Sequence, residues 1–507
     1  MDIRFQAGGP AAWKADIALL FVCREDAPAD SRPELAQAAP WFTIAPGLRD
    51  FRGDKEERLL LHGLPGLPLP RLLITGLGPR DACTLDIFRL AVAGAVRRCR
   101  ELGLASLLLP APGLDRLPGG ALRLLEEAAF AACTGLYNSK KWQKRKDKDA
   151  EKPDPEWLAL GFMEEFVPDE AHVMARRGEH SACGLALARD LTNEPPNLLS
   201  PAVLAGRAEE LAKRHTMRCD ILDKAQIEAQ GMGGLLAVGA GSVNEPRLIV
   251  LEYCPQGCEG QKPLTLVGKG LCFDSGGLSL KPALNMHHMK GDMSGAAAIL
   301  GALEAIALDA IPRRIAAVLA CAENMPGGNA ARPGDVVATL AGLNVEILNT
   351  DAEGRMALCD ALCYAQRRFT PDILVDIATL TGACAVALGS QIAGLFCTDD
   401  ALSEHLQTLG AAVSDHLWPL PLWEPYKEFL KSEVADLANI GPREGGAINA
   451  AVFLQQFVEQ DVRWAHIDMA GTDRIEKGNA FAPVGGSGYG VRLLVELART
   501  TMQEGRL

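Results

Sequence analysis

Short, continuously apolar segments alternate with segments of helical periodicity along most of this chain, and no other feature constrains its fold as strongly. In the second half of the chain, Arg247–Tyr253, Leu264–Gly268 and Ile315–Cys321 are apolar at most of their positions. Strands with this continuous pattern are buried on both faces, as in a mostly parallel sheet that helices cover on both sides. The alternation therefore predicts an α/β fold.

The first half shows the same alternation, and the chain length predicts two domains. Asp16–Cys23 is expected to form a buried strand, and Leu85–Leu102 has the periodicity of an amphipathic helix. A chain of 507 residues exceeds the roughly 250–300 residues over which a single hydrophobic core grows. We expect an N-terminal α/β domain over 1–167, a linker helix over 168–197 that ends at a proline stop, and a larger C-terminal α/β domain over 198–507.

The charge balance and the cysteines narrow the functional classes. The chain has 51 Lys and Arg against 64 Asp and Glu, a net charge of −13, which repels phosphate backbones and anionic lipids. Its one strong charge run, 139–156, is interpreted as a solvated loop. The 14 cysteines include no CxxC pair, and the sequence shows neither a signal-peptide pattern nor a membrane-spanning apolar stretch. We expect a reduced, cytoplasmic protein that binds neither membranes nor nucleic acid.

Several catalytic templates are missing from the sequence. It contains no H-E-x-x-H pair and no G-x-S-x-G elbow. A Walker A loop around Lys269 fails because Pro263 and Gly270 stand where glycine and Ser/Thr are needed. His287 and His288 are adjacent, so their side chains would diverge on a regular element. A histidine-based zinc site is therefore not expected.

Acidic residues recur beside glycines at expected strand-to-helix passages between residues 269 and 355. The acids are Asp274, Asp292, Asp351 and Glu353, accompanied by Lys269, Lys281, Lys290 and Arg355. Taken singly, each acid is compatible with a helix cap or a turn residue. Four carboxylates that converge at one sheet edge would repel each other strongly unless cations neutralise them. Oxygen donors with few His or Cys suit two divalent ions that share bridging carboxylates, so we favour a metal site.

Three segments of this region closely resemble the leucyl aminopeptidase family (cytosol aminopeptidase, peptidase family M17). They are VGKGLCFDSGGLSLKP (Val267–Pro282), MKGDMSGAAA (Met289–Ala298) and NTDAEGR (Asn349–Arg355). The likeness continues through RDLTNEPPNLLSP (Arg189–Pro201) and WAHIDMAGT (Trp464–Thr472), whereas the N-terminal half resembles the family only in layout. The resemblance implies a metalloaminopeptidase that hydrolyses the N-terminal peptide bond of peptides with a free α-amino group and prefers leucine-like residues. The C-terminal domain would hold the dinuclear site, and the N-terminal domain would be non-catalytic.

The resemblance also implies a set of metal ligands. Asp274 and Glu353 would bridge the two ions, Lys269 and Asp292 would complete the tighter site, and Asp351 would hold the more exchangeable ion. A lysine ligand has to be neutral, and a dication makes the loss of its proton favourable. The native ions would be zinc or manganese, with cobalt or magnesium as alternatives.

Two further residues are implied to be catalytic. Lys281 would polarise the scissile carbonyl and stabilise the oxyanion, and Arg355 would hold a bicarbonate-like anion that acts as a general base. Attack would come from a metal-bound hydroxide. The free amino group of the substrate would ligate one ion, which restricts cleavage to N-terminal residues.

The resemblance extends to the substrate pocket and the assembly. The residues expected to bind substrate are Met289, Asn349, Thr379, Leu380, Gly382 and Ala470. Beyond them, Asp473 is expected to face solvent, with the alternative that it admits basic N-terminal residues. Ser294 stands where the family usually has glycine. The family implies small peptides as substrates and a homohexamer.

Two other functional classes stay open at this point. A DNA-binding or regulatory role on the same scaffold is disfavoured by the net charge, and the basic run Lys140–Lys148 is short and borders acids. A dinuclear phosphoesterase would also use carboxylates and a lysine, but such sites commonly include histidine ligands, and none of the ligands implied here is a histidine.

Overall fold

The computed structural model describes residues 1–26, 51–63, 68–111, 114, 117–139, 141–142 and 152–500, and the chain forms two compact units. Met1–Ala182 and Lys477–Val484 form the N-terminal unit, and Cys183–Glu476 with the chain from Gly485 forms the C-terminal unit. The boundary lies within one long helix, α4 (Asp169–Asn193). Most of the charged run 139–156 lies outside the described residues.

The N-terminal unit contains a six-stranded sheet with the order β1-β6-β5-β2-β4-β3. Its strands are β1 (Asp2–Gln6), β2 (Ile17–Val22), β3 (Arg58–His62), β4 (Arg71–Gly76), β5 (Ser106–Pro110) and β6 (Trp157–Gly161). Neighbouring strands are parallel except β3, which runs antiparallel to β4. Helices α2 (Leu85–Leu102) and α3 (Ala121–Gly135) share a hydrophobic core with the sheet. The α/β character predicted for this part of the chain is confirmed.

The C-terminal unit contains an eight-stranded sheet with the order β15-β14-β17-β13-β9-β10-β8-β7. Its strands are β7 (Arg218–Leu222), β8 (Arg247–Tyr253), β9 (Leu264–Asp274), β10 (Ile315–Asn324), β13 (Ile373–Ala378), β14 (Ala393–Cys397), β15 (Leu417–Pro419) and β17 (Arg463–Asp468). The four central strands, β17, β13, β9 and β10, are parallel to one another. β8 and β14 join this centre in the antiparallel direction, so the sheet is rich in parallel pairs, as predicted, and mixed towards its edges.

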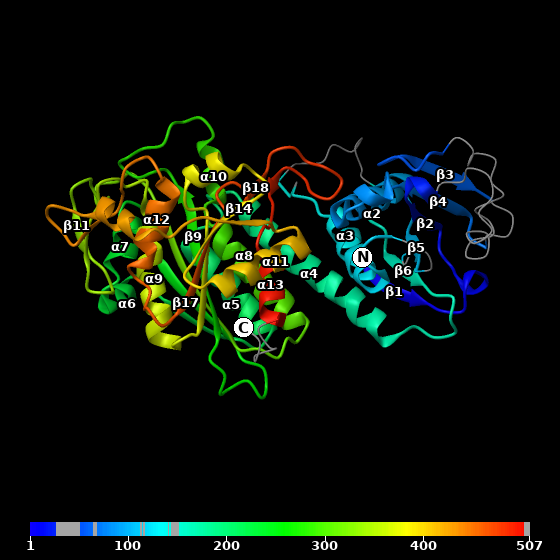
Figure 1. Ribbon diagram of the computed structural model, residues 1–507, viewed down its shortest axis with the longest axis horizontal. Helices are drawn as coiled ribbons and strands as arrows, with labels where there is room; N and C mark the ends of the chain where they lie inside the picture. The colour runs from blue at the N-terminus through cyan, green and yellow to red at the C-terminus, as the bar shows by residue number, and fades with distance from the viewer. Residues whose placement is uncertain are drawn as a thin grey trace. The chain divides into compact units, whose positions relative to one another are not determined.

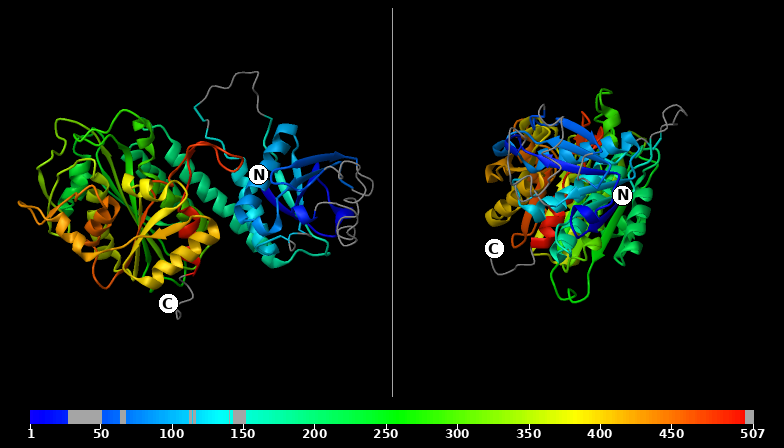
Figure 2. Two further views of the ribbon diagram at one scale, coloured as in Figure 1. Left: turned by 45° about the horizontal axis from the view of Figure 1, so that its top comes forward. Right: turned by 90° about the vertical axis from the view of Figure 1, so that its right-hand side faces the viewer.

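Helices cover both faces of the larger sheet (Figures 1 and 2). On one face lie α7 (Gly233–Gly239), α9 (Glu353–Phe369) and α12 (Gly446–Gln455), which share a hydrophobic core with β9 and β10. On the other face lie α5 (Pro201–Arg214), α8 (Ser294–Leu308) and α13 (Val491–Thr500). This cover explains the continuous apolar pattern, because every residue of β10 is buried.

A close approach between β9 and α8 fixes which way the functional part of β9 points. A Cβ on Gly268 would lie 3.0 Å from the Cα of Ala296 in α8, so only glycine permits this packing. Because side chains alternate along a strand, the next residue, Lys269, extends to the opposite face, where α9 begins. The helix contact therefore sets the direction of a chemically important side chain.

Shorter elements surround the two sheets. They are α6 (Lys224–Gln230), α10 (Gly382–Leu388), α11 (Asp400–Val413), β11 (Val336–Ala338), β12 (Asn344–Glu346), β16 (Leu437–Ala438), β18 (Arg474–Ile475), β19 (Gly485–Gly486) and the 3-10 helices η1 (Pro10–Ala12), η2 (Arg24–Asp26), η5 (Arg80–Ala82), η8 (Met286–Gly291) and η9 (Glu424–Leu430). β11, β12 and β16 form a small three-stranded sheet, and β18 pairs with β19.

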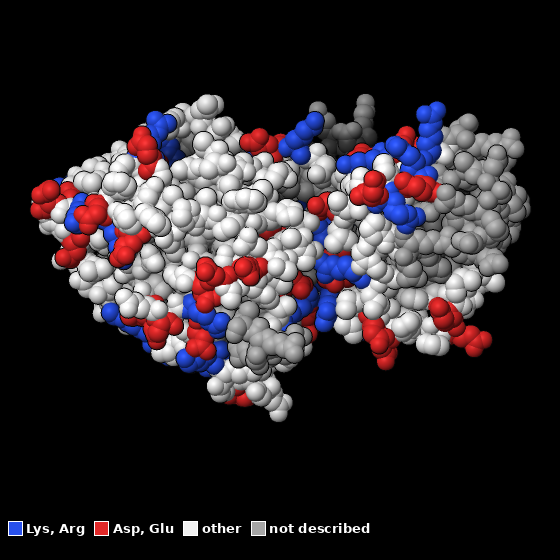
Figure 3. Space-filling model, viewed as in Figure 1, with Lys and Arg blue, Asp and Glu red and all other residues white. Residues whose placement is uncertain are grey.

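Surface charge and hydropathy agree with a packed two-unit protein. Lysine and arginine side chains are interspersed with acidic ones on the face shown in Figure 3, and no continuous basic stripe is visible among the described residues there. Among those residues, Met286–Leu308 has the length and hydropathy of a membrane span, but 89% of its most apolar window is buried inside the protein. This segment is accounted for as a core helix.

A buried polar cluster joins two central strands, and breaking it should destabilise the C-terminal unit. Asp376 accepts the indole N–H of Trp464 at 2.7 Å and lies 2.6 Å from Nδ1 of His466, and all three side chains are buried. Burial alone would lower the pKa of His466, but the Asp376 carboxylate outweighs it and raises this pKa. We expect Asp376→Asn to lower the free energy of unfolding by about 3–5 kcal/mol, measured as a lower thermal midpoint.

The pH dependence and a surface control make this prediction specific. Protonated His466 contributes its full stabilisation of the folded protein below its unfolded-state pKa of about 6.5. This stabilisation is lost as the pH rises through the higher folded-state pKa. The destabilisation by Asp376→Asn should therefore shrink at alkaline pH. Asp372→Asn removes an exposed pair with Lys262 and should cost less than about 1 kcal/mol. Equal effects of the two variants would contradict the prediction.

Candidate metal centre

The carboxyl ends of the parallel strands meet at one edge of the larger sheet, which is where sites form in such folds. β9 ends at Asp274 and β10 ends at Asn324. Asp351 lies in the turn before α9, and Glu353 is the first residue of that helix. Asp292 follows η8 directly, and one residue, Met293, separates it from α8. The four acids singled out in the sequence thus come from three separate chain segments to one place.

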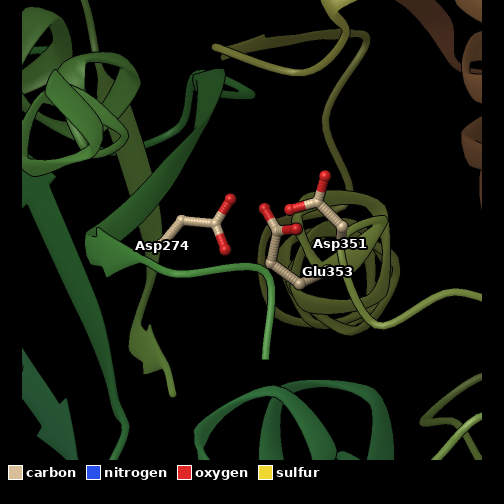
Figure 4. Close-up of side chains that lie close together, drawn as sticks. All are labelled: Asp274, Asp351 and Glu353. Atoms are coloured by element: carbon tan, nitrogen blue, oxygen red, sulfur yellow. The ribbon is translucent and has the colours of Figure 1, made fainter. Parts of the chain in front are cut away.

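Three of these carboxylates face one another (Figure 4). Asp274 extends from the end of β9 towards Glu353 and Asp351. One carboxylate oxygen of each residue lies within 4.8 Å of the other two. Asp274 and Glu353 are buried, whereas Asp351 is partly exposed. Ionised carboxylates repel strongly at such distances, so the arrangement requires positive charge nearby.

Lys269 supplies part of that charge from the middle of β9. Its Nζ lies 2.9 Å from Oδ2 of Asp292 and 2.9 Å from Oε1 of Glu353, and it donates to the carbonyl of Thr379 at 2.8 Å. A Cβ on Gly354 would lie 2.7 Å from Nζ, so the glycine in the NTDAEGR segment leaves the space that this lysine occupies. The lysine and α9 are therefore fitted to each other.

Lys281 supplies a second positive charge from the loop after β9. Its Nζ lies 2.8 Å from Oδ2 of Asp274 and 2.5 Å from Oδ1 of Asp351. Unlike Lys269, which is buried, Lys281 keeps a fifth of its side chain exposed. The two lysines thus occupy different depths of the same carboxylate cluster.

Burial and the charges of the cluster both shift the pKa values of its residues. Burial raises the pKa of Asp292 well above its usual range and also raises the pKa values of Glu353 and Asp351, against the opposing effect of the lysines. Burial alone would lower the pKa values of Lys269 and Lys281, but the neighbouring carboxylates raise both above the usual value. Four acids outnumber two lysines, so additional cations or protons are needed for balance.

The donor atoms of the cluster fit divalent metal ions. Oε2 of Glu353 is buried and has no hydrogen-bond partner among the described residues. Carboxylate oxygens and an amine, with no thiolate among them, are ligands that divalent ions such as Mg²⁺, Mn²⁺ or Zn²⁺ accept. A dication would also replace the protons that burial otherwise favours on the acids. The donor atoms of these residues therefore suit the divalent-metal site that is expected from the sequence.

Two asparagines position the cluster, and the sequence analysis missed both. Nδ2 of Asn324 donates to Oδ1 of Asp274 at 2.8 Å and to the carbonyl of Thr350 at 2.9 Å. Nδ2 of Asn439 donates to the carbonyl of Asn349 at 2.8 Å. A polar residue at the end of the apolar strand β10 was a signal for Asn324. Asn439 gives no comparable signal, because it lies far along the chain from the segment it holds.

Among the described residues, Arg355 forms no ion pair with the acids of the cluster, although it shares the first turn of α9 with Glu353. Its side chain is buried in the first turn of α9, and its Nη1 donates to the carbonyl of Asn439 at 2.9 Å. Its Nε has no hydrogen-bond partner among the described residues. Burial lowers the pKa of the guanidinium to about 10, and the charges of Glu353 and Asp468 oppose this only in part.

The cluster opens into a cavity of about 590 Å³ within the C-terminal unit. The residues expected to bind substrate that line it are Met289, Thr379, Leu380, Gly382 and Ala470, together with Lys269, Asp274, Lys281, Asp292, Asp351 and Glu353 of the cluster. Asn349 instead lines a narrow neighbouring cavity, which also reaches Glu353. Asp473 lines the main cavity, which differs from the solvent-facing position expected from the sequence.

Comparisons with known proteins place this site in a defined family. Residues 186–495 match the model of the cytosol aminopeptidase family, catalytic domain, and residues 40–146 match that of its N-terminal domain. A probable cytosol aminopeptidase of Desulfovibrio desulfuricans is 56% identical over 98% of this chain and 99% of its own length. One of Nitratidesulfovibrio vulgaris is 53% identical over 98% of both chains.

Solved structures show the same fold. The bottromycin maturation enzyme BotP in complex with Mn is 35% identical, with a TM-score of 0.81 over 96% of this chain and 100% of its own. A mutant of tomato leucine aminopeptidase is 30% identical, with a TM-score of 0.84 over 98% of this chain and 96% of its own. The similarity therefore extends through both units.

Divalent ions should stabilise the folded protein through this cluster. Mn²⁺ added to chelator-treated protein binds only where the carboxylates are assembled, so at about 100 times its dissociation constant it should add about 2.7 kcal/mol to the free energy of unfolding. Thermal unfolding with and without Mn²⁺ measures this effect. Asp274→Asn and Glu353→Gln should lose most of the shift, whereas the exposed Asp372→Asn should keep it. A full shift in both cluster variants would place the ion elsewhere.

Proposed function

The chain belongs to the cytosol aminopeptidase family, and we propose that it releases N-terminal residues from peptides with a free α-amino group and prefers leucine-like side chains. As a member of this family, the protein is a metal-dependent aminopeptidase, which is a hydrolase that acts on peptides. The observation that supports the finer proposal is the carboxylate and lysine cluster, which lines a cavity wide enough for a side chain.

We assign a ligand role to each residue of the cluster. Asp274 and Glu353 would hold both ions, Lys269 and Asp292 would complete one site, and Asp351 would complete the other. The buried positions of Lys269 and Asp292 against the partly exposed Asp351 support this division, because an exposed ligand exchanges its ion more readily. Bound ions would supply Lewis acidity at the scissile carbonyl and would lower the pKa of a water molecule to about 7. We propose zinc or manganese as the native ions.

Lys281 would act on the carbonyl of the bond that is cleaved. Its side chain lines the cavity, and the flanking carboxylates of Asp274 and Asp351 raise its pKa. Its ammonium group therefore stays charged at neutral pH and can donate from Nζ to the carbonyl oxygen as negative charge develops there. Because the ammonium group of Lys281 is already held in place, little reorganisation is needed when negative charge develops on the carbonyl oxygen.

Arg355 would hold a bicarbonate-like anion that accepts a proton from the attacking water. A buried guanidinium with an unpaired Nε among the described residues supports this role, because a planar anion matches its fork of N–H donors. The hydrogen bond from Nη1 to the carbonyl of Asn439 would fix the orientation of the fork.

The cavity wall would select the side chain of the N-terminal residue. Met289, Leu380 and Ala470 offer apolar surface, and Gly382 leaves room beside them. A branched aliphatic side chain that enters such a space removes apolar surface from water. This burial is favourable by about 25 cal/mol per Å² of buried area. This wall supports the proposed preference for leucine-like residues.

We also propose that the enzyme acts on small peptides in the cytoplasm as a homohexamer. The relatives described above are probable cytosol aminopeptidases, which supports the compartment, and the family resemblance supports the assembly. Light scattering on the purified protein should give six times the mass of one chain.

Hydrolysis of a leucyl chromogenic amide tests the proposed function. The Mn²⁺-loaded protein should cleave it, and Lys281→Met should lower kcat by about 10²–10³-fold, the usual effect of removing one oxyanion-stabilising donor. The variant should keep the thermal shift caused by Mn²⁺, because Lys281 is not a proposed ligand. N-acetylated substrate should resist cleavage. Absence of turnover with zinc, manganese and cobalt would refute the proposal.

A second assay isolates the role of Arg355. In buffer freed of carbon dioxide, added bicarbonate should raise kcat of the unaltered protein and leave kcat of Arg355→Met nearly unchanged. Formate or acetate at equal ionic strength provides the control for a general salt effect. Equal stimulation of both proteins would remove the anion from the mechanism.

A further inference from the structure

A carboxylate lies on the wall of the substrate cavity in addition to the metal cluster. Asp473 lines the cavity together with Ala470 and Gly471, beyond the carboxyl end of β17. Its position is well fixed, because its backbone N–H donates to the carbonyl of Met469 at 3.0 Å and its carbonyl accepts from Ser487 at 2.8 Å. The next residue begins β18, which is paired with β19. The acid is therefore held between a turn and a strand pair.

Gly291 has no side chain to place beside the carboxylate of Asp473. Oδ2 of Asp473 lies 3.4 Å from the place where a Cβ on Gly291 would stand, and Oγ of Ser294 lies 3.8 Å from the same point. Glycine at 291 thus keeps a side chain out of this region. Ser294 adds a second polar group, whose hydroxyl donates to the carbonyl of Gly291 at 2.5 Å. The cavity is also lined by His288, Arg474 and Glu476, so it has polar lining residues in addition to the apolar Met289 and Leu380.

Asp473 lacks a cationic partner of its own. Among the described residues, no lysine or arginine nitrogen lies within 4.0 Å of its carboxylate. Burial raises the pKa of Asp473 to about 7, and the more distant charges of Arg474 and Lys269 offset this only in part. A carboxylate in such a place is stabilised when a cation comes into contact with it.

We propose that Asp473 binds the cationic end of a lysine or arginine side chain at the substrate N-terminus, so that the enzyme accepts basic residues as well as leucine-like ones. This inference rests on the proposed aminopeptidase function and specifies its substrate class. The methylene stem would lie along Met289 and Ala470, and the charged group would reach Asp473. An uncharged leucine side chain would make only the first of these contacts.

The test compares substrates that share a shape and differ in charge. Lysyl and norleucyl amides differ at the end of the side chain, so the ratio of their kcat/KM values reports on Asp473. We expect Asp473→Asn, which keeps the shape of the residue, to lower this ratio on the order of 10- to 100-fold, as expected for one charge-assisted contact. Asp473→Met should lower the ratio at least as much and serves as the second variant.

The matched control is Glu476→Gln, which removes another acid that lines the cavity but is exposed to solvent. Solvent screens such a charge, so the ratio of kcat/KM values for lysyl and norleucyl amides should change less than about threefold in Glu476→Gln. A ratio that is unchanged in Asp473→Asn overturns the inference, as does an equal loss in Glu476→Gln. Faster cleavage of glutamyl than of lysyl amides by the unaltered protein also overturns it, because Arg474 would then dominate the cavity.

A binding measurement separates failure of this inference from failure of the proposed function. If leucyl amides are cleaved and lysyl amides are not, the function stands and the inference is wrong. If no amide is cleaved, the function is wrong, and thermal shifts decide the inference. Lysinamide should then raise the thermal midpoint of the unaltered protein more than norleucinamide does, and Asp473→Asn should abolish the difference. Equal shifts with both amides overturn the inference.

Discussion

Repulsion among four carboxylates at one edge of the larger sheet is the constraint on which the rest of the site depends. Asp274, Asp292 and Glu353 are buried where ionised acids are costly, and two lysines alone do not balance them. The arrangement becomes favourable when divalent ions add positive charge. Metal binding and the assembly of the site would therefore be coupled, because the same oxygens that repel each other are the proposed ligands.

The fold resists this repulsion by fixing each acid to an element that packs elsewhere. β9 carries both Lys269 and Asp274 through the centre of the sheet, where helices cover it on both faces. Asn324 holds Asp274 from the neighbouring strand, and Asn439 holds the loop before α9. A ligand on a buried strand moves little, so the geometry of the site follows from the packing of the sheet.

The cavity beside the cluster separates two demands of an aminopeptidase. In the proposed function, the charged cluster would bind the reacting end of the substrate, and the apolar wall would bind its side chain. Asp473 adds a carboxylate to the lining of that cavity. Specificity in such a pocket depends on which buried groups find partners, since an unpaired polar group costs more than a missing methylene contributes.

By itself, the sequence determined the α/β class and pointed to the acids and lysines that form the cluster. Continuous apolar runs indicated strands covered on both faces, Leu85–Leu102 matches α2, and the acids with their lysines pointed to divalent ions before any contact was known. These features are local, because periodicity and residue type need no knowledge of the chain path. Only the tertiary structure showed that β8 and β14 run antiparallel, that Asn439 holds the loop beside Glu353, and that Asp473 lines the cavity. Each of these depends on contacts between residues far apart in the chain, which are set by how the elements pack and not by the pattern of any one segment.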